Sequence, residues 1–147
     1  MDRPILLIED DRDDETLVRR ALSTCRVPAA VVVARDGAEA LDYLFALGEW
    51  KHRDIGEQPV LVLLDISLPK IDGFEVLRQI RADPLTRLLP VVVLTSSRQQ
   101  SDVLSGYVAG ANGYVVKPID FGKFVEATQE LGNYWGQLNE APPSIAS

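Results

Sequence analysis

The sequence predicts an α/β fold: a doubly wound, five-stranded parallel sheet with helices on both faces. Five short apolar runs rich in β-branched side chains alternate with amphipathic helical stretches. Most of these runs lack polar alternation, which is typical of strands covered on both faces. Each run leads into a helical stretch, and this rhythm gives parallel strands joined by right-handed crossovers. With 147 residues, 46% of them hydrophobic, the chain has the size of one such domain.

The strands and helices can be placed in order along the chain. The predicted strands are residues 5–8, 30–34, 60–64, 91–94 and 114–116. The predicted helices are residues 14–24, 38–47, 74–82 and 99–109, followed by a last helix that begins near Phe121. Each helical stretch carries its apolar side chains three and four residues apart, and Asp-Gly, Asp-Pro and Lys-Pro turn signals fall between the elements.

Composition excludes several classes of protein. No apolar run approaches the ~18 residues needed to cross a bilayer, and the acidic N-terminus lacks a signal peptide's apolar core, so we expect a cytoplasmic protein without a membrane segment. Cys25 is the only cysteine, which excludes an intrachain disulfide. The net charge of −7 argues against broad nucleic-acid binding. We expect one folded domain over residues 1–140 and a disordered tail over residues 141–147.

Polar side chains follow four of the predicted strands. Glu9 and Asp10 follow the first strand, Asp65 the third, Thr95 the fourth and Lys117 the fifth. In an open parallel sheet these strand ends lie at one edge, where ligands bind. Clustered carboxylates repel one another unless a proton or a cation lies among them, and Mg²⁺ prefers such oxygen ligands. A carboxylate beside Mg²⁺, with a lysine and a hydroxyl close by, can accept a phosphoryl group, so we expect Asp65 to be a nucleophile.

The sequence resembles a known family, the receiver domain of two-component response regulators. The matching motifs are LLIEDD at residues 6–11, VLLDISLPKIDG at 62–73, VVLTSS at 92–97 and GYVVKP at 113–118. The resemblance implies the flavodoxin-like receiver fold and phosphorylation of Asp65 from a phosphohistidine on a sensor histidine kinase. It implies a protein that assists only its own phosphorylation and dephosphorylation, without turning over an external substrate.

The resemblance also implies the metal ligands. Asp10 and Asp65 would bind Mg²⁺ directly, together with the main-chain carbonyl of Ser67. Glu9 would contribute mainly through bound water. It replaces the aspartate that is commoner at this position.

Three further side chains have implied roles in phosphate binding and switching. Thr95 would donate its hydroxyl to a phosphoryl oxygen, and Lys117 would pair with the phosphate. Tyr114 would turn inward as Thr95 moves, which would change the surface near the fourth helix, the fifth strand and the last helix. Ser67 and Ser97, two positions after Asp65 and Thr95, flank the path of attacking water, so we expect them to set the lifetime of the phosphorylated state.

Two features point to a subfamily. Only 30 of the 147 residues follow Lys117, which predicts a stand-alone receiver without an output domain. The long link ALGEWKHRDIGEQP, the segment DPLTRLLPVVVLTSS and the ending NYWGQL resemble the single-domain regulators that are paired with phytochrome-type light-sensing histidine kinases.

The last helix predicts a homodimer. Its apolar residues from Phe121 to Leu138 recur three and four residues apart. At ~1.5 Å per residue, Trp135 and Leu138 lie about 15 Å or more beyond residues 121–125, the part of the helix expected to cover the sheet, and so past the expected sheet edge. We therefore expect Trp135 and Leu138 to contact a second copy of the chain. Gly132 and Gly136 weaken this part of the helix by roughly 1 kcal/mol each.

Three alternative functions remain open at this stage. A phosphatase of the haloacid-dehalogenase type also uses an aspartate nucleophile and Mg²⁺, but it needs a second Asp where this chain has Ser67. A flavodoxin-like cofactor binder needs a phosphate-binding loop where this chain has the acidic residues 9–11. A receiver-like scaffold would bind its partner without phosphorylation, although it would have no need for the acid, threonine and lysine set.

Overall fold

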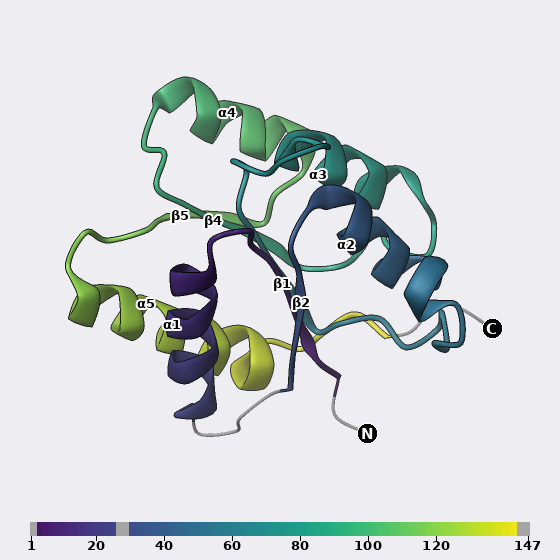
Figure 1. Ribbon diagram of the computed structural model, residues 1–147, viewed down its shortest axis with the longest axis horizontal. Helices are drawn as coiled ribbons and strands as arrows, with labels where there is room; N and C mark the ends of the chain where they lie inside the picture. Colours follow the sequence, from purple (N-terminus) through teal and green to yellow (C-terminus); the bar gives the residue numbers. More distant parts are fainter. Residues whose placement is uncertain (1–2, 26–29, 144–147) are drawn as a thin grey trace.

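The computed structural model describes residues 3–25 and 30–143 and contains a parallel five-stranded sheet (Figure 1). The strand order is β2-β1-β3-β4-β5, which confirms the predicted doubly wound fold. The strands are β1 (Ile5–Ile8), β2 (Val31–Ala34), β3 (Leu61–Leu64), β4 (Val91–Thr95) and β5 (Gly113–Val116). Each lies within one residue of its predicted position.

Helices cover both faces of the sheet. They are α1 (Arg12–Ser23), α2 (Gly37–Leu44), α3 (Gly73–Ala82), α4 (Gln100–Ala109) and α5 (Phe121–Asn133). Figure 1 shows α2, α3 and α4 on one side of the sheet and α1 and α5 on the other. A short 3₁₀ helix, Gly48–Trp50, follows α2, and a π-helical turn, Tyr134–Leu138, extends α5.

The sheet separates two hydrophobic cores. Along β1, Leu6 and Ile8 pack with α2 and α3, whereas Ile5 and Leu7 pack with α1 and α5. All four side chains are buried, as are the four residues of β3. These strands lack polar alternation because each is covered on both faces, as the sequence predicted.

The first two helices differ from the prediction at one end. α1 begins at Arg12, two residues early, because the Asp11 carboxylate accepts hydrogen bonds from the amides of Asp13 and Asp14. α2 ends at Leu44 rather than at residue 47. Ala46 and Gly48 have left-handed φ values of 54° and 56°, which an α-helix cannot accommodate.

At the end of α5, Trp135 is not left uncovered by its own chain, although its contact with a second copy stays a prediction. The indole packs, partly buried, against the core between α1 and α5, and it meets the Tyr134 ring edge to face, so Trp135 covers its own chain. A methyl group on Gly132 would lie 2.7 Å from both Cys25 Sγ and Leu22 Cδ2, so this glycine lets α5 approach α1 closely. Leu138 is 75% exposed, and its contact with a second copy of the chain stays a prediction.

Two sequence expectations concern the ends of the chain and its relation to membranes. Residues 139–143 lie outside regular secondary structure, and residues 144–147 of the predicted tail lie outside the described part of the chain. Within residues 3–25 and 30–143, no helix is long and apolar enough to span a bilayer.

Candidate functional site

The parallel register brings the predicted site residues to one level of the sheet. Ile8 pairs with Leu64, and Leu64 pairs with Val93, so the residues that follow β1 and β3 emerge side by side. Thr95 at the end of β4 pairs with Val116, the residue before Lys117. Glu9, Asp10, Asp65, Thr95 and Lys117, which we call the strand-end cluster, therefore lie at the carboxyl edge of the sheet.

Asp65 is held by three hydrogen-bond donors. The amide of Ser67 and the hydroxyl of Thr95 donate to its Oδ1 atom at 2.9 and 3.0 Å. The ammonium group of Lys117 donates to the other oxygen, Oδ2, at 2.9 Å. With 7% of its surface exposed, Asp65 has a fixed orientation at the mouth of the cluster.

Lys117 connects three carboxylates. Its Nζ atom lies 2.6 Å from Glu9 Oε1, 2.7 Å from Asp14 Oδ2 and 2.9 Å from Asp65 Oδ2. An ammonium group has three protons, and here each has a carboxylate partner. The lysine thereby partly compensates for the charge of the acidic groups around it.

The two buried acids, Glu9 and Asp65, have pKa values shifted in opposite directions. Burial raises the pKa of Glu9 to about 7, although the ammonium group of Lys117 acts in the opposite direction. Burial also acts to raise the pKa of Asp65, but the Ser67 amide and Lys117 more than offset it and hold that pKa below its usual value. Burial lowers the pKa of Lys117, yet its hydrogen bonds to Asp14 and Glu9 more than reverse this and raise it. At neutral pH Asp65 is thus an ionised carboxylate.

The carboxylates of Glu9, Asp10 and Asp65 form a group with the chemistry of a divalent-cation site. One ligand oxygen from each lies within 4.8 Å of the other two. Asp10 is exposed and the other two are buried, so the group is open to solvent on one side. Hard oxygen ligands with an open side suit Mg²⁺, which keeps several water ligands when bound to proteins.

A second chain of hydrogen bonds runs from β5 to α4. The Tyr114 hydroxyl donates to the main-chain carbonyl of Ser97 at 2.9 Å, and the Ser97 hydroxyl donates to Asp102 Oδ2 at 2.6 Å. The Tyr114 ring lies under Gly106, where a methyl group would come within 3.1 Å of Cδ2. Tyr114 and the loop that follows Thr95 are thus directly connected.

Asp14 and Asp102 are contacts of the site that the sequence interpretation missed. The charge of Asp14, like those of Asp13 and Glu15, fits the positive end of α1 without any role in the site. Asp14 lies one helical turn after Asp10, and this spacing was the available signal that its side chain could reach the same edge of the sheet. Asp102 had no comparable signal, since its contact depends on the path of the loop before α4.

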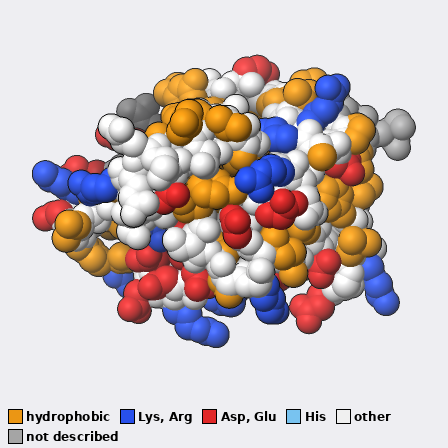
Figure 2. Space-filling model, turned by 90° about the horizontal axis from the view of Figure 1, so that it is seen from above, with side chains coloured by type: hydrophobic (Ala, Val, Ile, Leu, Met, Phe, Trp, Pro, Cys, Tyr) orange, Lys and Arg blue, Asp and Glu red, His pale blue; other side chains and the backbone are white. Residues whose placement is uncertain are grey.

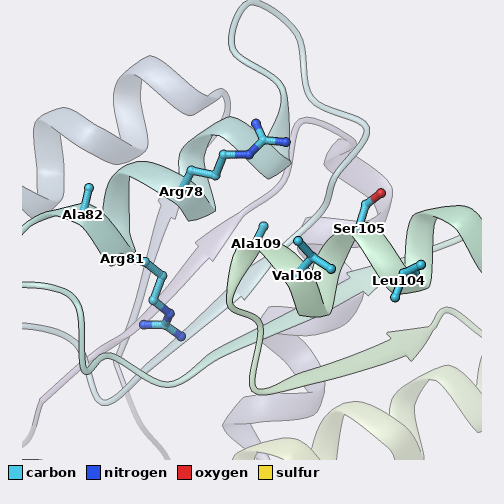
Figure 3. Close-up of a pocket in the computed structure, with 7 residues that line it drawn as sticks. All are labelled: Arg78, Arg81, Ala82, Leu104, Ser105, Val108 and Ala109. Carbon is cyan, nitrogen blue, oxygen red and sulfur yellow. The ribbon is translucent and has the colours of Figure 1, made fainter.

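A separate hollow lies between α3 and α4, away from the strand-end cluster. Its volume is about 630 Å³, and Figure 3 shows its lining residues Arg78, Arg81, Ala82, Leu104, Ser105, Val108 and Ala109. Arg81 donates to the carbonyls of Leu89 and Gly110 at 2.7 and 2.8 Å, so it fastens the end of α3 to the neighbouring loops. Figure 2 shows hydrophobic side chains exposed on this side of the molecule.

The fold and the strand-end cluster define a receiver domain. Residues 5–129 match the family described as Response regulator receiver domain, and the chain belongs to this family. Receiver-domain response regulators are generally signalling proteins rather than classic enzymes, and receiver domains bind Mg²⁺ at an acidic pocket.

Similar proteins include regulators linked to phytochromes. Response regulator Rcp1 of Synechocystis sp. is 36% identical over 131 residues, which cover 89% of this chain and 87% of Rcp1. Its Mn²⁺-bound structure has a TM-score of 0.88 at 34% identity, covering 95% of this chain and 99% of that one. The phosphorylated cyanobacterial phytochrome response regulator RcpA has a TM-score of 0.90 at 35% identity, covering 97% and 99%. The bacteriophytochrome response regulator RtBRR is 49% identical with a TM-score of 0.77, covering 98% and 86%.

Proposed function

We propose that this chain is a response regulator that accepts a phosphoryl group on Asp65 from the phosphohistidine of a sensor histidine kinase, in a Mg²⁺-dependent reaction. One observation carries the proposal. A main-chain amide, an ammonium group and a hydroxyl fix the position of the buried Asp65 carboxylate, and the amide and the ammonium group hold its pKa below its usual value. Acidic side chains able to hold a divalent cation lie beside it.

The reaction joins an Asp65 carboxylate oxygen to phosphorus. As that bond forms, the bond from phosphorus to the donor's imidazole nitrogen breaks, and the nitrogen keeps the electron pair. The Thr95 hydroxyl and the Lys117 ammonium group, which donate to Asp65 before transfer, are positioned to donate to phosphoryl oxygens after it. Fixed donors of this kind stabilise the charge of a transferring phosphoryl group.

Glu9, Asp10 and Asp65 would hold Mg²⁺, and the main-chain carbonyl of Ser67 would complete the protein ligands. The bound ion would supply neutralisation of phosphoryl charge. The spacing of the three carboxylates and the Mn²⁺-bound form of the similar Rcp1 support this assignment. Residue 67 offers no carboxylate of its own for a phosphatase's general acid, and its amide is bound to Asp65.

The switch would run through Thr95 and Tyr114. When Thr95 moves toward the phosphoryl group, the loop that follows it would move as well. The Tyr114 hydroxyl is bound to the carbonyl of Ser97 in this loop, so the ring would change position with it. The surface of α4, β5 and α5 would change with it. Ser67 and Ser97 would set the lifetime of the acyl phosphate, and the contact with Asp102 would restrict the Ser97 hydroxyl.

The kinase partner would be a phytochrome-type photoreceptor. Support comes from the similarity to RcpA and RtBRR, which are a phytochrome and a bacteriophytochrome response regulator. The chain would assist its own phosphorylation and dephosphorylation and would act on no external substrate.

The homodimer predicted from the last helix would use Leu138, which is exposed, and Trp135, which packs only in part on its own chain. We expect light scattering to give a dimer mass for the wild type and a monomer mass for Leu138→Glu. A wild-type monomer, or a dimer that Leu138→Glu leaves intact, would remove this part of the proposal.

Intact mass spectrometry after incubation with acetyl phosphate and Mg²⁺ tests the phosphoacceptor. The wild type and Asp54→Asn, a control that loses an exposed carboxylate outside the strand-end cluster, should each gain one phosphoryl group. Asp65→Asn should gain none. A beryllofluoride titration follows if the wild type gains no mass, because this anion binds receiver sites without a donor enzyme. No gain and no beryllofluoride binding would favour the phosphorylation-independent scaffold.

A further inference from the structure

The hollow between α3 and α4 has an apolar wall that is open to solvent. Leu104 and Val108 lie one turn apart on the same side of α4, and they are 66% and 79% exposed. Figure 3 shows Arg78 and Arg81 on α3, across the hollow from these two side chains. We call the surface formed by the seven lining residues the α3–α4 groove.

The guanidinium group of Arg81 is partly buried in this groove and has uncharged partners. It donates at 2.7 to 2.9 Å to three main-chain carbonyls and one side-chain amide oxygen, those of Arg87, Leu89, Gly110 and Asn112. Among the described residues, no carboxylate forms an ion pair with Arg81. Burial lowers its pKa, as expected for a cation without a nearby anion. Because buried charges usually have an ionic partner, the groove holds a positive charge that the chain leaves uncompensated.

Arg78 adds a second cation on the same wall of the groove. Its Nη1 atom lies 3.2 Å from Glu75 Oε1, and the two side chains are 56% and 47% exposed. An exposed pair of this kind contributes little free energy, so another anion can compete for the arginine. None of the seven lining residues is acidic, although the whole chain has a net charge of −7. The groove is therefore a positive and apolar site on an acidic protein.

The shape of the groove favours a helix over a small molecule. Ligand pockets typically bury roughly 70–90% of a small molecule. Here the exposure of Leu104 and Val108 leaves one wall open, so a small ligand would stay largely in water. An amphipathic helix lying between α3 and α4 would cover both side chains with apolar residues three and four positions apart.

We propose that the α3–α4 groove binds an amphipathic helix of a partner protein, whose apolar face covers Leu104 and Val108 and whose acidic side chains pair with Arg78 and Arg81. This surface goes beyond the proposed function, because it lies away from the strand-end cluster and involves no phosphoryl group. A second copy of this chain fits the groove less well. A symmetric contact would bring the arginines of one copy against those of the other.

Titration of the ¹⁵N-labelled full chain with a designed helical peptide tests this surface. The peptide has leucines three and four residues apart on one face and glutamates beside them. Its binding should shift the amide signals of α3 and α4 and leave those of α1 in place. A second peptide, with lysines instead of the glutamates, should bind at least about tenfold more weakly, because it places like charges beside the two arginines.

Substitutions separate the apolar contribution from the charged one. Leu104→Ser should weaken binding of the glutamate peptide about tenfold, and Arg78→Gln about threefold. Leu47→Ser and Arg19→Gln are the matched controls. Leu47 is 54% exposed, and Arg19 forms an exposed pair with Glu15, yet neither lines the groove. Both control variants should bind within about twofold of the wild type.

Three results would overturn the proposal. The first is equal binding of the two peptides, and the second is the absence of shifts in α3 and α4. The third comes from light scattering, where Val108→Glu should leave the mass of the wild type unchanged. A dimer that Val108→Glu converts to a monomer would show that a second copy covers the groove instead.

Discussion

The strand-end cluster and the surface of α4 differ in burial and in the partners of their side chains. Asp65 and Lys117 are 7% and 8% exposed, and each makes several hydrogen bonds. On α4, by contrast, Leu104 and Val108 are 66% and 79% exposed. The phosphoacceptor is therefore preorganised, whereas a shift of α4 would disturb little buried packing at these two side chains. This difference is what a switch needs, since a fixed chemical site can act on a surface that moves at low cost.

The largest effect should come from crowding the loop behind Asp65. In Gly73→Ala, the new methyl group would lie 2.5 Å from Ile66 Cα and 2.9 Å from the Asp65 carbonyl oxygen, so main chain has to move. We expect phosphorylation by acetyl phosphate to slow on the order of 100-fold, because the acceptor is displaced. Urea unfolding should show a loss of about 1–3 kcal/mol.

Gly136→Ala is the matched control for that substitution. Apart from its own residue, its two chain neighbours and the adjoining helix backbone, no atom of the described residues lies within 4 Å of the position that its methyl group would occupy. Phosphorylation should be unchanged. Equal behaviour of the Gly73 and Gly136 variants would contradict the view that the strand-end loop is rigid.

The next largest effect is expected on Mg²⁺ affinity when Asp10, the exposed carboxylate of the Glu9, Asp10 and Asp65 group, is replaced. In Asp10→Asn the site loses one anionic ligand, and the Kd for Mg²⁺ measured by calorimetry should rise on the order of 10- to 100-fold. Asp13→Asn lies outside the group and should leave the Kd within about twofold. Unchanged Mg²⁺ binding in Asp10→Asn would show that the metal assignment is wrong.

A smaller effect should appear in the pH dependence of Mg²⁺ binding. Burial raises the pKa of Glu9 to about 7, above the ordinary 4.5. Between these two pH values the folded protein keeps a proton on Glu9 that the unfolded chain has lost. The stability from this group is fully present below pH 4.5 and is lost as the pH rises through 7. Because Mg²⁺ favours the ionised group, its affinity should fall by up to about tenfold for each pH unit below 7.

Titrations at several pH values, in buffers of different ionisation enthalpy, measure this affinity and the proton released. Glu9→Gln should bind Mg²⁺ more weakly and with much less pH dependence. A wild-type affinity that is constant from pH 6 to pH 8 would contradict the protonation of Glu9.

The smallest effect is expected on α4. Leu104→Ser should change the free energy of unfolding by less than about 0.5 kcal/mol, since the side chain is 66% exposed. Leu63→Ala, at a fully buried position on β3, should cost about 2–5 kcal/mol. The phosphorylation rate of Leu104→Ser should match the wild type. A large loss of stability in Leu104→Ser would show that α4 is part of the rigid core.

The sequence predicted the sheet well because its strands are buried on both faces. Residues 61–64, for example, are all apolar, which indicates a buried strand, and turn residues separate this strand from the helices on either side of it. The meeting of Glu9, Asp65, Thr95 and Lys117 followed from one topological rule, since the carboxyl ends of parallel strands share an edge.

The features that were not predicted depend on details of tertiary packing. The charge of Asp14 fits both a helix start and an ion pair, and only the reach of Lys117 distinguishes them. The end of α2 depends on left-handed residues at Ala46 and Gly48, and alanine gives no sign of that conformation. Trp135 has the spacing of an exposed seam, yet the close approach of α5 to α1 at Gly132 buries part of its ring.

Identifying the phosphorylated residue is the most direct test of the proposal that Asp65 is the phosphoacceptor. The wild type would be treated with acetyl phosphate and Mg²⁺ and then reduced with borohydride, which converts an aspartyl phosphate into homoserine, and its peptides would be sequenced by mass spectrometry. We expect homoserine at position 65 and nowhere else. Homoserine at Asp10 or Asp14, or a phosphoryl group that resists borohydride, would contradict it.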